Sequence, residues 1–212
     1  MRRANSNWSN AIKEIEELDK KEIKEKLINT KIEKHESSLL LMPPLVKPLH
    51  GIAPREIKGE DWWYATRNEV YKKNNYHCLA CGVHKSNAKL YQWLEAHEYY
   101  EVDYINTKYT LKDIISLCHC CHAFIHYQRT TAMLDNNKIT KNEFDIIMKH
   151  GKTILEEINA NKDNIVLPED HFPENNGKWK EWYLDFEGKK YYSKFNDLNE
   201  WIEYYDNLNK NK

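Results

Sequence analysis

The placement of the cysteines constrains this chain more than any other feature. Cys78-Leu-Ala-Cys81 and Cys118-His-Cys-Cys121 form two close pairs, and Cys120 is the one further cysteine in 212 residues. A turn with two intervening residues can present two sulfurs to one metal ion without strain, and two such turns complete a tetrahedral zinc site. We therefore expect these two pairs, Cys78, Cys81, Cys118 and Cys121, to bind one structural Zn²⁺ ion. Buried free thiols or a disulfide are the alternative.

The composition is that of a folded chain without a membrane segment. Hydrophobic residues make up 41%, with seven Trp and fourteen Tyr, which is enough for a core, and no apolar run is long enough to span a bilayer. The N-terminus, Met-Arg-Arg-Ala-Asn-Ser, leads into charged residues rather than into a secretory signal. Clustered cysteines without an export signal favour metal binding in a reducing compartment, so we expect a cytoplasmic protein.

The chain is expected to have an N-terminal region, a central domain and a C-terminal extension, at 1–61, 62–133 and 134–212. In the first region, Ile and Leu at helical spacing among mixed charges predict an amphipathic helix over 7–38. Four prolines and Gly51 exclude a long helix over 39–61 and predict an extended arm.

The central domain is expected to alternate helices and strands around the cysteine turns. The pattern predicts a helix over 60–74, a strand over 90–100, a short strand or turn over 114–117, and a helix over 121–133.

The C-terminal extension is expected to begin with a helix over 141–160. Alternating aromatic residues at 182–186 and 191–195, on either side of Glu187-Gly188, predict a β-hairpin. A terminal helix with Leu198, Trp201, Ile202 and Tyr205 on one face is expected to pack against it. The fold class is therefore α+β.

Histidines near the second cysteine pair predict a second metal site. His122 and His126 are four residues apart, so they share one helical face and can reach one ion. His97 on the preceding strand could complete a three-ligand site with an open coordination position, which distinguishes a catalytic metal from a structural one. Ordinary surface histidines are the alternative.

These pieces together resemble the HNH endonucleases over about residues 62–129. The matching segments are WWYATRNEVYKKNNYHCLACG, then LEAHE, then DIISLCHCCHAFIH. Members of that family commonly have an Arg-x-x-Val helix before C-x-x-C-G, a strand with Leu-Glu-x-His-His or Leu-Glu-x-Asp-His, and Leu-Cys-x-x-Cys-His. The resemblance implies a ββα-metal core in a zinc-stabilised treble clef.

The resemblance also implies roles for the residues at the matching positions. The four paired cysteines would be the structural zinc ligands, and His97, His122 and His126 would bind the catalytic metal. Glu98 stands where the family has its general-base histidine, and Asp113 stands where the middle Asn is expected.

Two alternatives for these roles stay open. If the strand is shifted by one residue, His97 is the base and the metal loses that ligand. Asn106, from a longer loop, could supply the Asn in place of Asp113. Replacing His by Glu lowers the unperturbed basicity by about two pKa units, or roughly 3 kcal/mol, and only part of this difference reaches the rate.

The implied activity is metal-assisted hydrolysis of phosphodiester bonds in nucleic acid, most simply DNA. The second divalent cation could be Mg²⁺, Mn²⁺, Ni²⁺ or Zn²⁺, although imidazole ligands favour a transition metal. Arg129 and Arg67 are candidates for phosphate contacts, with a bracing role favoured for Arg67.

Two other classes of function compete with a nuclease of phage, mobile-element or defence origin. One is a treble-clef module that binds nucleic acid or protein and has lost catalysis, which Glu98 and Asp113 favour. The other is an interaction or inhibitor protein that contacts a partner through the N-terminal arm or the C-terminal extension. The net charge of −1 neither requires nor excludes nucleic acid, because binding needs positive charge on one face rather than over the whole chain.

Overall fold

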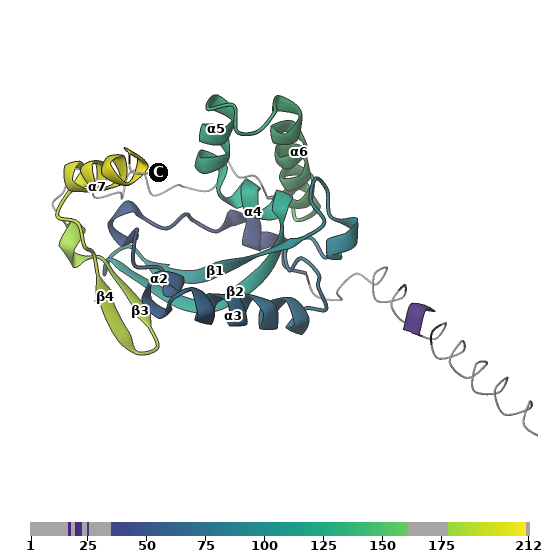
Figure 1. The fold of residues 1–212 in the computed structure, drawn as a ribbon, viewed down its shortest axis with the longest axis horizontal. Coiled ribbons are helices and arrows are strands. Elements are labelled where there is room, and N and C mark those ends of the chain that lie inside the picture. Colours follow the sequence, from purple (N-terminus) through teal and green to yellow (C-terminus); the bar gives the residue numbers. More distant parts are fainter. Residues whose placement is uncertain (1–16, 18–19, 23–24, 26–34, 161–177, 211–212) are drawn as a thin grey trace, which may run out of the picture.

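The protein has a mixed α+β fold built on one four-stranded sheet (Figure 1). The computed structural model describes residues 17, 20–22, 25, 35–160 and 178–210. The strands are β1 (Leu94–Asp103), β2 (Lys108–Cys118), β3 (Tyr183–Phe186) and β4 (Lys189–Tyr192). They lie in the order β1-β2-β3-β4, so β1 is an edge strand.

Helices cover both faces of this sheet. The α-helices are α2 (Pro54–Lys58), α3 (Glu60–Lys73), α4 (His119–Ile125), α5 (Tyr127–Asp135), α6 (Lys141–Glu157) and α7 (Leu198–Lys210). Short 3-10 helices are η1 (Ser37–Leu41), η2 (Lys47–Leu49), η3 (Lys85–Asn87) and η7 (Trp179–Glu181). Figure 1 shows α3 along one side of β1 and β2, with α4, α5 and α6 on the other side.

The β1–β2 hairpin positions the residues of both predicted sites. The two strands pair antiparallel from Leu94↔Cys118 to Asp103↔Lys108, with an irregularity between Tyr99 and Tyr100. Because β2 ends at Cys118 and α4 begins at His119, the hairpin leads directly into the helix that carries the histidines.

Most buried apolar residues of the described chain belong to two clusters. The first surrounds the cysteines and includes Leu40, Leu117, Phe124 and Ile147. The second lies between the N-terminal arm and the C-terminal hairpin, and includes Val46, Leu49, Tyr109, Trp182 and Leu184. Burial of this apolar surface holds the arm and the hairpin against β2.

The expected helices and strands of the central domain are present, with two differences. The helix predicted over 60–74 and the strand predicted over 90–100 correspond to α3 and β1. β2 is much longer than the predicted short strand, because it pairs with β1 from Lys108 to Cys118. The single helix predicted over 121–133 is wrong: His126, with φ −85° and ψ 45°, separates α4 from α5.

The N-terminal arm contains no long helix, as its prolines predict. It is not simply extended, however, since η1, η2 and α2 form short turns within it. The predicted helix over 7–38 lies mostly outside the described residues, and its last residues belong to the 3-10 helix Ser37–Leu41 instead.

The predicted C-terminal β-hairpin is confirmed, but it is not an appendage. β3 pairs in parallel with β2 from Lys108↔Tyr183 to Thr110↔Asp185, so the extension continues the central sheet. The second strand ends at Tyr192, earlier than the predicted 195.

The terminal helix α7 contacts the N-terminal arm. The Trp201 Nε1 atom donates to His50 Nδ1 at 3.2 Å, whereas Ile202, predicted on the packed face, is 42% exposed.

Within the described part of the chain, no helix is long and apolar enough to cross a membrane.

Candidate metal centres

The four paired cysteines converge on one point. Their sulfur atoms all lie within 4.8 Å of one another, and the sulfurs of Cys81 and Cys118 are 3.8 Å apart. With Zn–S bonds of about 2.3 Å, two sulfurs at the corners of a tetrahedron are about 3.8 Å apart. The cluster therefore has the dimensions of a four-thiolate zinc site, and the predicted ligand set, Cys78, Cys81, Cys118 and Cys121, is brought together.

Backbone hydrogen bonds shape the first cysteine turn and fasten it to the sheet. Gly82 N donates to Cys78 O at 2.8 Å, and Gly82 has the positive φ of 71° that glycine adopts without strain. Leu79 N donates to Ser116 O at 2.8 Å. The turn after α3 is thereby fixed beside the end of β2, where the second cysteine pair begins.

The cluster requires a cation to ionise fully. Burial raises the pKa of Cys121. Burial by itself also raises the pKa of Cys78, but hydrogen bonds from the neighbouring thiols outweigh it and lower that pKa. Hydrogen bonds from the neighbouring thiols thus stabilise one thiolate, at Cys78, while the pKa of Cys121 stays raised. Only a bound metal ion can balance the charge of four thiolates in this space.

His150 on α6 lies beside the sulfur cluster. Its Nε2 atom is 3.5 Å from Cys121 Sγ and 3.8 Å from Cys118 Sγ, close enough to donate a hydrogen bond to a metal-bound thiolate. The remaining cysteine, Cys120, is buried outside the cluster, with its sulfur 3.7 Å from Lys89 O.

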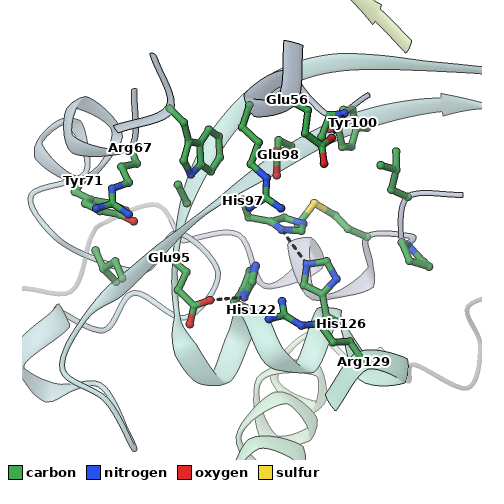
Figure 2. Close-up of a pocket in the computed structure, with 18 of the residues that line it drawn as sticks. Glu56, Arg67, Tyr71, Glu95, His97, Glu98, Tyr100, His122, His126 and Arg129 are labelled. Carbon is green, nitrogen blue, oxygen red and sulfur yellow. Dashed lines mark hydrogen bonds and ion pairs between the residues drawn. The ribbon is translucent and has the colours of Figure 1, made fainter. Parts of the chain in front are cut away.

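The three predicted histidines form a second cluster (Figure 2). His97 comes from β1 and His122 from α4, and His126 is the residue between α4 and α5. One ring nitrogen from each lies within 4.8 Å of the others, and His126 Nε2 is 3.3 Å from His97 Nδ1. Two nitrogens bound to one tetrahedral ion at about 2.0–2.1 Å would be about 3.3–3.4 Å apart.

Glu95 supports this cluster through a contact with His122. Its Oε2 atom is 2.7 Å from His122 Nδ1, and its Oε1 atom is 2.7 Å from His119 Nδ1. With Nδ1 of His122 engaged, Nε2 is the nitrogen left to face a metal, the usual arrangement of a carboxylate behind a metal-binding imidazole. Although burial alone raises the pKa of Glu95, hydrogen bonds from the two histidines hold it well below the usual range.

Burial, together with the neighbouring His122 and His126, lowers the pKa of His97 well below its ordinary value. The neutral imidazole is the form that binds a metal, so this environment suits a ligand.

Glu98 lies next to the histidine cluster but not in it. Neighbouring residues of a strand point to opposite sides, and Figure 2 shows Glu98 beside Glu56 and Tyr100. Burial raises the pKa of Glu98, and the opposing charge of Arg55 reduces that rise. Glu98 is therefore a partly buried carboxylate at the wall of the same cavity.

Asp113 and Asn106 are not brought to the histidines. Asp113 is exposed on β2, with its carboxylate 3.7 Å from Lys73 Nζ and 2.8 Å from the backbone nitrogen of Ile114. Asn106 lies in the β1–β2 turn, where its side chain donates to Asp103 at 2.7 Å.

A cavity of about 1070 Å³ opens onto the histidines and Glu98. Arg129 and Arg67 also line it; Figure 2 shows Arg129 beside His126, and Arg67 beside Tyr71. The Arg67 guanidinium carbon is 5.0 Å from the Tyr64 ring centre, and its Nε atom is buried with no hydrogen-bond partner among the described residues.

Several residues of the two sites were not predicted from the sequence. Glu95 carried a usable signal, because it precedes His97 by two residues and so lies on the same side of the strand. His150 carried none, because it lies 29 residues after Cys121 and nothing local indicates their contact. Arg55 and Glu56 also reach the cavity, from the arm.

Comparison of the chain with protein-family models, with curated proteins and with solved structures gives no match.

Proposed function

We propose that the protein is a metal-dependent endonuclease of the HNH type, which hydrolyses phosphodiester bonds in nucleic acid. The observation that carries the proposal is the convergence of His97, His122 and His126, from a β-hairpin and the helix that follows it, beside a four-cysteine cluster. This order of elements is what a ββα-metal core in a treble clef requires, and Glu95 supplies the supporting carboxylate.

The donor set favours a particular kind of ion. Three imidazoles suit Zn²⁺, Ni²⁺ or Mn²⁺ better than Mg²⁺, which prefers oxygen ligands. A divalent ion held there would supply Lewis acidity toward the scissile phosphate and its leaving oxygen.

The residues around the cluster suit the remaining steps. Arg129, beside His126, can bind a phosphate oxygen and so orient the substrate. Glu98, at the wall of the cavity, can accept a proton from an attacking water. In this assignment His97 is a metal ligand and not the base, because its Nδ1 atom lies 3.3 Å from His126 Nε2.

Plasmid cleavage tests the proposal. Purified protein is incubated with supercoiled plasmid and a panel of divalent ions, with His122→Ala as the matched variant. We expect nicking or linearisation by the wild type and its loss in His122→Ala. Cleavage that the variant retains would indicate a contaminating nuclease and would contradict the proposal, as would the absence of cleavage with every ion.

A second candidate is a treble-clef module that binds nucleic acid without cutting it. Glu98 at the position of the base and the distance of Asp113 from the site favour this candidate. A gel shift of DNA without cleavage would support it, and salt should weaken that shift steeply, because phosphate contacts release counterions.

A further inference from the structure

The loop before β1 carries two aromatic rings that the proposed chemistry does not use. Tyr91 and Trp93 stack with ring centres 4.3 Å apart and planes within 6°. Leu90, with a φ of 65°, turns the chain just before them. The pair therefore stands at the entrance to the strand that carries His97.

Two contacts fix the position of the Tyr91 side chain. Its hydroxyl donates to Glu143 Oε1 on α6 at 3.2 Å. The His119 ring meets the Tyr91 ring edge-on at 4.6 Å, and His119 is itself bound to Glu95 at 2.7 Å. Tyr91 is thus a fixed support that connects Trp93 to the residues behind the histidine site.

Trp93 lines the cavity and is only partly covered. Tyr91 covers one face of the indole, yet 49% of Trp93 is exposed, and Trp93 lines the same cavity as the histidines. A large aromatic side chain left exposed on a rigid support is the arrangement on which nucleobases stack in single-strand-binding proteins.

The cationic groups of the cavity suit a phosphate backbone, and Glu56, Glu95 and Glu98 line the cavity as well. Arg55, Arg67, Lys85 and Arg129 all line it. Lys85 Nζ lies 4.2 Å from the centre of the Tyr76 ring, which also lines the cavity, so a cationic group and an aromatic ring lie together there. Positive groups interleaved with aromatic rings are what a groove that follows a single strand provides.

We propose that Trp93 is a stacking platform for an unpaired nucleobase, so that the site takes nucleic acid with a single-stranded stretch next to the phosphate it binds. The inference rests on the proposed function for the identity of the substrate. In an intact duplex each base is already stacked on its neighbours, and exposing one costs a few kcal/mol. A substrate that already contains an unpaired base avoids this cost and is preferred.

Binding measured by fluorescence anisotropy tests the platform separately from cleavage. The full-length protein, without added divalent ions, is titrated into a labelled single-stranded oligodeoxynucleotide, its duplex, a duplex with a central unpaired gap, and the matching oligoribonucleotide. Gels run afterwards confirm that the strands are intact. The DNA and RNA arms distinguish the two sources of an unpaired base.

We expect the single strand and the gapped duplex to bind more tightly than the duplex. Trp93→Leu should weaken single-strand binding by about 5- to 150-fold, the range that corresponds to base–aromatic stacking, and Trp93→Phe should retain part of it. Duplex binding should not change. Tyr192→Leu is the control, because Tyr192 is 52% exposed on β4 and does not line the cavity.

Equal single-strand affinity of Trp93→Leu and the wild type would overturn the inference, as would a wild-type preference for the duplex or no binding to any of the strands. Failure of the nuclease proposal gives a different result. If the protein cuts no substrate but binds single strands through Trp93, the nuclease proposal fails and the stacking inference stands. If it cuts nucleic acid but Trp93→Leu does not change single-strand binding, the stacking inference fails and the nuclease proposal stands.

Discussion

At the scale of single residues, Glu95 has the most connected position in the histidine site. One carboxylate accepts from His119 with one oxygen and from His122 with the other, both at 2.7 Å. Through His119 it also reaches the Tyr91 ring. The ring orientation of a metal-binding histidine, and hence the metal affinity, depends on such a partner.

Glu95→Gln should therefore weaken metal binding at the proposed histidine site without removing a ligand. We expect the affinity for the divalent ion to fall by about 10- to 100-fold, because the amide cannot accept with both of its ends. Isothermal titration with Mn²⁺ or Zn²⁺ measures the change. The control is Glu101→Gln, which lies on the same strand but pairs with Lys112 at the surface.

If Glu95→Gln binds the ion as tightly as Glu101→Gln does, then Glu95 has no part in the site. A parallel melt checks that both variants remain folded.

The sequence predicted which ligands lie close together, but it only partly predicted the direction in which their side chains point. The four cysteines and three histidines come together as predicted, because C-x-x-C turns and an i, i+4 pair fix distance locally. The resemblance implies a role for Asp113 at the site, yet the pleat of β2 turns it toward Lys73 at the surface. The direction of a strand residue depends on register, which this sequence does not encode locally.

At the scale of elements, the contact between α4 and α6 is unusually close. Gly151 on α6 lies against the buried ring of Phe124 on α4, and a Cβ at this position would overlap that ring. Since α4 also carries Cys121 and His122, its position against α6 affects both clusters.

Gly151→Ala should lower the free energy of unfolding by about 1–3 kcal/mol, because the ring of Phe124 has to move within a packed core. Urea denaturation followed by circular dichroism measures the change. Lys152→Ala, the next residue and exposed on the same helix, is expected to have little effect. A Gly151→Ala variant as stable as Lys152→Ala would show that the Phe124 ring can move at little cost, and would contradict the prediction.

The elements themselves were mostly predictable, whereas their long-range pairing was not. Apolar periodicity predicted α3, β1, α6 and the C-terminal hairpin. No local pattern predicts the parallel pairing of β2 with β3, since more than sixty residues separate the paired positions. The break at His126 was also missed, because its neighbours continue a helical pattern across it.

At the scale of the whole molecule, the sulfur cluster joins elements that are far apart in the chain. It connects the turn after α3, the end of β2 and the start of α4, with His150 of α6 alongside. Hydrophobic burial around the cysteines depends on those elements staying together.

Cys78→Ser should therefore unfold the central domain and release the structural zinc, because a four-ligand zinc site supplies much of the folding free energy of a small zinc domain. Cys120→Ser is the matched control, since this thiol is equally buried but lies outside the cluster. Thermal melts and metal analysis of both variants measure the effect. Unchanged melting and zinc content in Cys78→Ser would remove the zinc assignment.

The most direct test of the account is the number of metal ions bound per chain. Wild-type protein and His122→Ala are equilibrated with excess Zn²⁺, dialysed, and measured by mass spectrometry of the metal together with quantitative amino-acid analysis. We predict two ions per chain in the wild type and one in His122→Ala, which keeps all four cysteines. One ion in both proteins would mean that the histidines bind no metal and would contradict the proposed nuclease site.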